Sequence, residues 1–494
     1  MIKGRITQMS NYTLTTFDCQ NYIMKIIQLL CNIINKCFQM KYSILLIFTC
    51  FIGSITFAAS NLFPADSITS KKDKKAAVKF VKEGQLFFEG GKVKDALNRF
   101  REAAVKDPNA WEPLFWIGKC HYNLNNYGLT LKYEKDALNL NKQKNKNELY
   151  EYIGLAFHRT NLLDSALYYF DLVKKSSTEK EFNYTTIASE IAQCEFAKKE
   201  LSTGKKSLKK GLKDVNSGYN DYAPIFTDQG KTLYITSRRP DTKGGLMNPD
   251  DQEYFEDIYR AVWNETNQNW DSLSNELDRL NSNGFDAFSC IYANGTKGLI
   301  TINNTAIDLK NQTKSSDLFT VELSSKQKWS TPKRIDDNSI NTTFFEGAAS
   351  ITDDGNTLYF VSDRNAETSS SDIFVSTKTN GEWSKPKALP ASINSLENET
   401  TPFISGDGRF LFFSSNGLLG MGGYDVFVVE NLGSTWGTPI NLGSEVNSVN
   451  NDTHFQYYPQ IKKAVLSSFE IIGQKSSMDV YELDFSTFKI PTAK

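Results

Sequence analysis

The chain has 494 residues, which is long for a single domain and predicts two or three. Its 56 basic residues balance 57 acidic ones, and this argues against a general nucleic-acid-binding protein. Aromatic residues make up 13 % of the chain, enough for sizeable cores, so long disorder is not expected.

The amino-terminal region has the pattern of an export signal. Met40 and Lys41 precede an apolar run that ends at Phe57, and small residues follow at 58–60. The run is about 16 residues long, which suits a secretory signal and is short for a membrane span. We therefore predict a signal peptide at 40–59 and a linker at 60–72, and interpret 1–39 as an extension upstream of the true start. The alternatives are a retained membrane-anchoring leader and lipid attachment at Cys50.

Residues 73–200 have helical spacing and an internal repeat. Gly118 follows Gly84 by 34 residues, which is the period of a tetratricopeptide repeat (TPR). The first unit resembles a full TPR in its small, aromatic and proline positions: Gly84, Phe87, Ala96, Phe100, Ala103 and Pro108. A third unit returns to the pattern from Gly154 to Phe170, and a last helix at about 183–199 is interpreted as a cap.

The second TPR unit fits this pattern less well. His121 stands where an aromatic residue is usual, and the unit continues with Tyr133 and Ala137. One extra residue, Asp136, breaks the usual spacing there. This predicts a shifted second helix.

Stacked helix pairs bury the repeated small and aromatic residues, so a binding function would lie on the concave wall made by the first helix of each pair. The alternative is that the residues of this wall are merely solvated. By their position in the family pattern, the side chains expected on the wall, and the candidate protein-binding residues, are Gln85, Glu89, Lys119, Tyr122, Asn123, Glu151, His158 and Arg159.

After a lysine-rich joint at 201–215, helical spacing gives way to short β-rich runs broken by turn residues. One element recurs every 53 to 60 residues: an aspartate followed by an aliphatic and an aromatic residue. Its five copies begin at Asp257, Asp317, Asp372, Asp425 and Asp479. A turn and strand precede each copy, and a tryptophan follows four of them, at Trp270, Trp329, Trp383 and Trp436. About four short strands in each unit is typical of a propeller blade.

This second repeat resembles the TolB-type, WD40-like propeller family, which implies an all-β propeller over 216–485 and a tail at 486–494. The last unit stops soon after Asp479, whereas the lysine-rich joint resembles the piece that follows Trp436. We therefore predict that the joint gives a closing strand to the last blade, which removes exposed edges. Five blades are predicted, with six as the alternative.

Nothing in the sequence indicates catalysis or a cofactor. Its few histidines and cysteines beyond residue 60 lack metal-ligand spacing, and no Walker loop or G-x-S-x-G elbow occurs. The recurring aspartates fall once per blade, so we expect them to form turn or strand-cap hydrogen bonds. The tryptophans are expected to pack between blades.

The overall fold class is thus multidomain, with a TPR helical solenoid followed by an all-β propeller.

An export signal, TPR units and a TolB-like propeller together resemble envelope proteins of gliding and type IX-secreting bacteria. Longer relatives add an OmpA-like peptidoglycan-binding domain that is not detected here. The resemblance implies a non-catalytic scaffold in the periplasm or at the periplasmic face of the outer membrane. Other envelope proteins would be its partners, with membrane contact only through those partners or a leader. The alternative is a glycan- or peptide-binding propeller, or one with hydrolase-like activity.

Overall fold

The computed structural model describes residues 69–492, except 144–145, 177–185, 246, 249–250, 278, 304–315, 336, 366–369 and 473–474. The predicted upstream extension, the signal peptide and most of the linker therefore lie outside the described residues. Within the described part of the chain, no helix is both long and apolar enough to cross a membrane.

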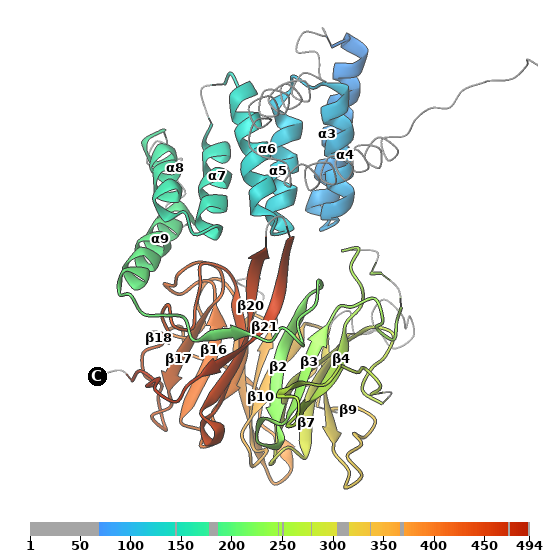
Figure 1. Ribbon diagram of the computed structural model, residues 1–494, viewed down its shortest axis with the longest axis vertical. Coiled ribbons are helices and arrows are strands. Elements are labelled where there is room, and N and C mark those ends of the chain that lie inside the picture. The colour runs from blue at the N-terminus through green and yellow to red at the C-terminus, as the bar shows by residue number, and fades with distance from the viewer. Residues whose placement is uncertain are drawn as a thin grey trace, which may run out of the picture. The chain divides into compact units, whose positions relative to one another are not determined.

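Helices make up the first part of the described chain (Figure 1). Three antiparallel hairpins are followed by one further helix, which confirms the predicted TPR-like solenoid with its cap. The helices are α3 (Lys71–Glu89), α4 (Val93–Lys106), α5 (Trp111–Asn123), α6 (Tyr127–Leu140), α7 (Asn147–Arg159), α8 (Leu163–Ser176) and α9 (Thr186–Ser202).

Each hairpin is tight because a glycine on its first helix faces a buried side chain on its second. A methyl group placed on Gly84 would lie 2.6 Å from the ring of Phe100, and one on Gly154 would lie 2.6 Å from the ring of Phe170. Both phenylalanines are fully buried. The small and aromatic residues of the repeat are therefore packing residues, since any side chain at the glycine would separate the helices.

In the second hairpin this place is taken by Glu134, and the predicted extra residue is wrong. Gly118 lies against the Glu134 side chain, sixteen positions further along the chain, as Gly84 lies against Phe100. Ala137 is buried at the same offset as Ala103. No residue is therefore inserted. Glu134 occupies the place of the core aromatic residue, and the neighbouring Tyr133 does not.

Glu134 and His121 are both buried, and none of their side-chain polar atoms has a hydrogen-bond partner within the described residues. Burial raises the pKa of Glu134 well above its ordinary value and lowers the pKa of His121 to about 4. Burial thus favours the neutral form of both groups, which limits the cost of burying them. His121 stacks on Tyr133 with ring centroids 5.5 Å apart.

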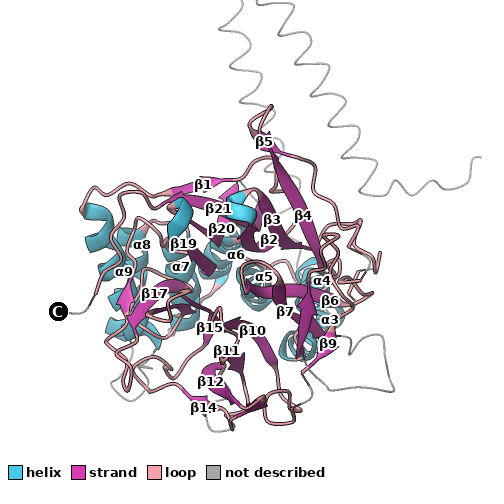
Figure 2. Ribbon diagram, turned by 90° about the horizontal axis from the view of Figure 1, so that it is seen from below, coloured by secondary structure: helices cyan, strands magenta, loops and turns pink. Residues whose placement is uncertain are grey.

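Five antiparallel sheets follow and stand around a ring (Figure 2), which confirms five blades over six. In each sheet the strands are hydrogen-bonded in order from the innermost strand outward, and the third sheet has the extra short strand β14 (Lys387–Ala388). The first sheet contains β2 (Asp221–Thr227), β3 (Thr232–Ser237), β4 (Asp257–Asn264) and β5 (Asn269–Trp270). The second contains β6 (Phe285–Tyr292), β7 (Lys297–Asn303), β8 (Asp317–Glu322) and β9 (Lys333–Arg334). The third contains β10 (Glu346–Ile351), β11 (Thr357–Ser362), β12 (Asp372–Thr379) and β13 (Glu382–Trp383). The fourth contains β15 (Glu399–Ile404), β16 (Phe410–Ser415), β17 (Asp425–Glu430) and β18 (Ile440–Asn441).

The fifth blade takes its outer strand from the beginning of the propeller. Its strands are β19 (Asp452–Tyr458), β20 (Lys463–Ile472), β21 (Lys475–Asp484) and β1 (Lys209–Gly211). β1 pairs antiparallel with β21, with Lys210 opposite Glu482. Lys209 Nζ donates to Asp452 Oδ1 at 2.7 Å and to Ser468 Oγ at 3.0 Å. The lysine-rich joint thus supplies the strand that closes the ring.

An asparagine side chain joins each blade to the chain segment that enters the next. Asn447 Oδ1 accepts from the backbone N–H of Val426 at 2.8 Å, and Asn447 Nδ2 donates to the Val426 carbonyl at 3.0 Å. We call this double contact the asparagine bridge. The same bridge joins Asn281 to Ile258, Asn341 to Leu318, Asn394 to Ile373 and Asn216 to Val480. Each residue whose backbone N–H and carbonyl the bridge binds directly follows a recurring aspartate, so the bridge recurs once per blade together with that element.

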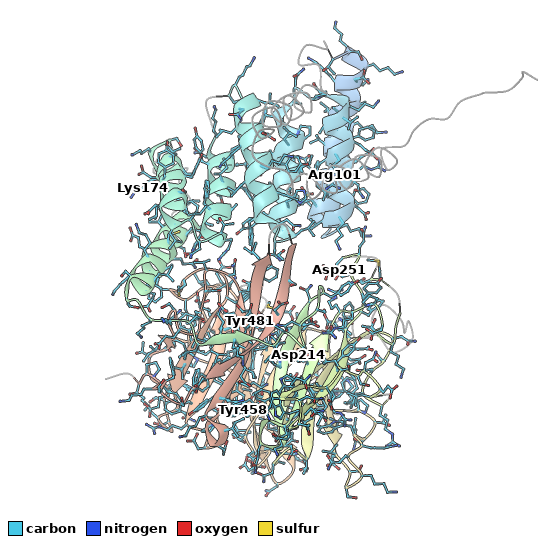
Figure 3. All side chains as sticks on the ribbon, in the orientation of Figure 1. Arg101, Lys174, Asp214, Asp251, Tyr458 and Tyr481 are labelled. Carbon is cyan, nitrogen blue, oxygen red and sulfur yellow. The ribbon has the colours of Figure 1, made fainter. Side chains whose placement is uncertain are left out.

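The tryptophans pack at blade boundaries. Trp270 of the first blade is buried with Phe226 and with Val465 and Val480 of the fifth. Trp329 of the second blade is buried against Tyr234 and Phe288, across the boundary with the first. Trp383 and Trp436, each partly buried, extend the clusters between blades two and three and between blades three and four. Tyr458 lies at the closing boundary, where its hydroxyl accepts from the N–H of Phe226 at 2.9 Å (Figure 3).

Candidate functional site: the TPR wall and the propeller channel

Lys119 occupies the middle of the predicted TPR wall. Its Nζ lies 4.6 Å from the ring centroid of Trp116, 4.9 Å from that of Tyr152, 5.1 Å from that of Phe115 and 6.0 Å from that of Phe88. These rings come from α3, α5 and α7, the first helices of the three hairpins. An ammonium group over aromatic faces is held by cation–π attraction while its N–H donors stay available. Within the described residues no carboxylate or carbonyl oxygen accepts a hydrogen bond from Lys119 Nζ.

Four other predicted residues lie along the same first helices. Gln85 and Glu151 are half-buried, whereas Glu89 and Asn123 are exposed. Asn123 Nδ2 donates to the Lys119 carbonyl one turn earlier at 3.1 Å. Burial raises the pKa of Glu151, and the nearby charge of Lys119 opposes that rise. The structure thus places a cation, a carboxylate and amide groups along one wall.

The remaining three predicted residues lie where the wall meets the propeller. His158 is fully buried, with Nδ1 3.0 Å from Glu190 Oε2 and Nε2 2.8 Å from the Met421 carbonyl. Arg159 Nη1 donates to the Val449 carbonyl at 2.8 Å. Met421 and Val449 also join the apolar core of α7, α8 and α9. His158 and Arg159 therefore bind the propeller of their own chain.

Charge is balanced inside this contact. Burial opposes ionisation of Glu190, but the hydrogen bond from His158 and the charge of Arg159 hold its pKa below the ordinary value. Burial likewise opposes the charge on Arg159, but Tyr122 and Glu190 raise the pKa of its guanidinium. Tyr122 is hydrogen-bonded to Arg159, so this third residue helps to position the arginine. A paired, hydrogen-bonded ion cluster is costly to break, so the contact fixes one end of the wall.

A second contact joins the first hairpin to the propeller. Lys94 Nζ donates to the Gln252 carbonyl at 3.0 Å, and Gln252 Nε2 donates to Asp95 Oδ1 at 3.1 Å. Gln252 lies between β3 and β4, in the same connection as Asp251, which pairs with Arg238 at 2.7 Å (Figure 3). The first and third hairpins are thus both bonded to propeller loops, and Lys119 lies on the hairpin between them.

The propeller contains a cavity of about 390 Å³ along its innermost strands. A volume of this size is within the range of small-molecule sites. Strands from all five blades contribute to the lining, which combines aromatic rings with hydroxyl, amide and imidazole groups. Its residues include Tyr222, Glu256, Phe288, Thr301, Thr400 and His454. Apart from the number of blades, no sequence pattern predicts this cavity.

The innermost strand of every blade has a β-bulge where it lines the cavity. In four blades the bulged residue has a positive φ although it is not glycine: Ala223 at 51°, Ala348 at 44°, Thr401 at 47° and His454 at 54°. Such a backbone costs about 1–2 kcal/mol per residue relative to an ordinary strand. Cross-blade hydrogen bonds hold it, as from His454 N to Thr401 Oγ1 at 3.1 Å.

One carboxylate and one imidazole share a stretch of this lining. Tyr222 is hydrogen-bonded to Glu256, and its ring centroid lies 5.7 Å from that of His454. Burial raises the pKa of Glu256 and lowers the pKa of His454 to about 4. His454 is therefore neutral at pH 7.

The recurring aspartates bind loops and outer strands. Asp425 Oδ2 accepts from the N–H of Met421 at 2.7 Å, and Asp257 Oδ2 accepts from that of Lys243 at 2.6 Å. Asp317 pairs with Arg334 at 2.8 Å. Across the described ranges no three His, Cys, Asp or Glu side chains gather as a metal-binding group.

No protein-family model matches the chain, and no curated protein matches it. Among solved structures, the first TPR domain of Spaghetti, bound to an HSP90 peptide, covers 27 % of this chain and 99 % of its own at 17 % identity, with a TM-score of 0.24. The TPR2B domain of yeast Sti1, in complex with pHsp70, covers 24 % of this chain and 93 % of its own at 18 % identity, with a TM-score of 0.21. Zg3597, a family 117 glycoside hydrolase of Zobellia galactanivorans, covers 56 % of this chain and 90 % of its own at 11 % identity, with a TM-score of 0.34. These likenesses carry no argument about function.

Proposed function

We propose that the protein is a non-catalytic interaction scaffold whose TPR wall binds an extended peptide segment of a partner protein. The observation that carries the proposal is the position of Lys119, whose ammonium lies among four aromatic rings from three helices. Aromatic faces supply contact area at little entropic cost, and the ammonium can donate to a carboxylate or carbonyl oxygen of the peptide. Exposed Asn123 can pair with the peptide backbone beside it.

We further propose that the scaffold works in the bacterial cell envelope, in the periplasm or at the periplasmic face of the outer membrane. The signal-peptide pattern at 40–59 and the pairing of TPR units with a TolB-like propeller support this location. Its partners would be other envelope proteins, in a secretion or gliding-type assembly. The protein would require no cofactor and bind no nucleic acid.

Site-specific photo-crosslinking tests the wall. A benzoylphenylalanine in place of Asn123 should give adducts with envelope proteins in cells, and Lys119→Gln should abolish them. Lys135 is the matched control because it also lies over an aromatic ring, 4.6 Å from that of Phe157, but on the second helix of its pair. Lys135→Gln should leave the adducts unchanged. Adducts that survive Lys119→Gln in full would overturn the assignment of the wall.

Fractionation and mass spectrometry of the mature amino terminus test the location. Recovery with the envelope fraction and cleavage near Ala58 are expected. Recovery of the full-length chain from the cytoplasm would overturn the location and leave the peptide-binding wall to be judged by the crosslinks.

A further inference from the structure

We propose that the propeller cavity is a binding site for an uncharged saccharide, a function separate from the TPR wall. The cavity of about 390 Å³ brings together aromatic and uncharged hydrogen-bonding residues, and Glu256 is the one carboxylate or cation among the described residues that line it. That combination matches a ligand that has C–H faces and hydroxyl groups but no formal charge.

The aromatic part of the lining suits the C–H faces of a sugar ring. Aromatic residues from separate strands contribute to the lining; Tyr222, Phe285, Phe345 and Phe403 are partly exposed, whereas Phe288 and Phe455 are buried in the cores between blades. Apolar C–H groups gain by leaving water for such faces, and flat rings provide a firm contact surface.

The polar part of the lining suits sugar hydroxyls. Ser289 and Thr301 are hydrogen-bonded to each other at 2.8 Å on neighbouring strands, so each retains capacity for a further bond. Thr400 lies on the innermost strand of the fourth blade, and Gln456 and His454 lie on that of the fifth. Hydroxyl, amide and neutral imidazole groups both donate and accept, as a polyhydroxylated ligand requires.

The charge inside the cavity argues against other ligand classes. Among the described residues, no lysine or arginine lines the cavity, and the nearest cation, Arg238, already acts on Glu256 and Tyr222. Glu256 is hydrogen-bonded to the Tyr222 hydroxyl, and burial raises its pKa. A carboxylate held in this way can accept from two neighbouring sugar hydroxyls. Its single charge is a weak counterpart for a strongly cationic ligand.

The backbone around the cavity is held in place before any ligand arrives. The bulged residues Ala223 and His454 donate their N–H groups to Ser467 Oγ at 3.0 Å and Thr401 Oγ1 at 3.1 Å, each in the adjacent blade. A site whose strained backbone is fixed by its surroundings loses little freedom on binding. The alternative is that the bulges serve only the packing of the blades, in which case the cavity would bind no saccharide.

The test uses the full mature chain and a neutral glycan array, followed by titration calorimetry with cellobiose, maltose and N,N′-diacetylchitobiose. At least one neutral glycan should bind. Thr400→Val keeps the side-chain shape but removes a hydroxyl, so it should weaken binding about tenfold. Thr379→Val, at an exposed position at the end of β12, should leave binding unchanged. Glu256→Gln should weaken binding without abolishing it.

Three results would overturn the proposal: no neutral glycan binds; binding is equal in Thr400→Val and wild type; or arginine-rich peptides bind instead and lose affinity in Glu256→Gln. Lys119→Gln should not alter glycan binding, which separates this proposal from the peptide-binding wall.

Discussion

The side-chain amide of Asn216 bonds both backbone groups of Val480, which lies 264 positions later in the chain. Oδ1 accepts from the Val480 N–H at 2.8 Å, and Nδ2 donates to the Val480 carbonyl at 3.0 Å. The other four asparagine bridges join residues that are 21 or 23 positions apart. The same local device therefore holds the first and last blades together.

Replacing Asn216 with alanine should lower the free energy of unfolding by about 2 kcal/mol, because two backbone groups lose their partner. Chemical denaturation followed by tryptophan fluorescence measures this. Asn267→Ala, at an exposed turn position, is the control and should change stability by less than about 0.5 kcal/mol. Equal losses in the two variants would show that the bridge contributes nothing to closure.

Replacing Glu134 with methionine should stabilise the protein, and more so at high pH. Burial raises the pKa of Glu134 in the folded protein, so the folded state holds its proton more tightly than the unfolded chain. The stabilisation that comes from this bound proton is fully present below about pH 4.3, the pKa of a glutamate in the unfolded chain. It is lost as the pH rises through the pKa of Glu134 in the folded protein. Glu134→Met should therefore gain about 1–3 kcal/mol at pH 8 and less at pH 4. Glu195→Met, at an exposed position on α9, should show no such trend.

Asp221 and Asp286 are equivalent residues with different partners. Each accepts from a serine N–H and hydroxyl at the entry to its blade, but only Asp221 also pairs with an arginine, Arg239, at 2.9 Å. Burial raises the pKa of Asp286 to about 7. The stabilisation from its proton is present below about pH 3.9 and lost as the pH rises to 7.

Asp286→Asn, which stays neutral, should therefore match wild type near pH 4 and exceed its stability at pH 8 by up to about 4 kcal/mol. Asp221→Asn should instead destabilise at pH 8, because Arg239 loses its carboxylate. Denaturation at the two pH values distinguishes them. A gain in both variants would mean that the arginine pair is not stabilising.

Replacement by glycine should have opposite effects on stability at Ala348 and at Ala349. Ala348 has φ of 44°, whereas Ala349 is buried and has no positive φ. Ala348→Gly relieves backbone strain and should be neutral or stabilise by up to about 1 kcal/mol. Ala349→Gly should destabilise by about 1–2 kcal/mol through lost packing and greater freedom of the unfolded chain. The midpoints of urea denaturation test the pair, and a large loss in Ala348→Gly would argue that its methyl group is essential.

The fold could be predicted from the sequence because both repeats consist of residue types that the packing of the fold requires. Gly84 and Gly154 face buried rings, and each recurring aspartate precedes a bridged residue, so period and chemistry agree. The second TPR unit was predicted wrongly because Glu134 fills a buried place that the repeat pattern assigns to an aromatic residue. Four of the five bridge asparagines are followed by serine, but Asn341 is followed by threonine, so an Asn-Ser pattern identifies only four of them.

The site was less predictable because it depends on contacts between distant segments. His158 and Arg159 do lie at the end of the predicted wall, but their partners Met421 and Val449 are 263 and 290 positions away. No local pattern predicts that they bind the propeller. The cavity is shaped by bulges, and neither alanine nor threonine signals a positive φ from the sequence.

The pairing of β1 with β21 also sets the order of events during synthesis. β1 emerges from the ribosome before the rest of the propeller, but its partner strand ends at Asp484 and emerges almost last. Four blades can form as they are made, whereas the fifth must wait with an unpaired edge. The ring of blades therefore cannot close until translation of the propeller is nearly complete.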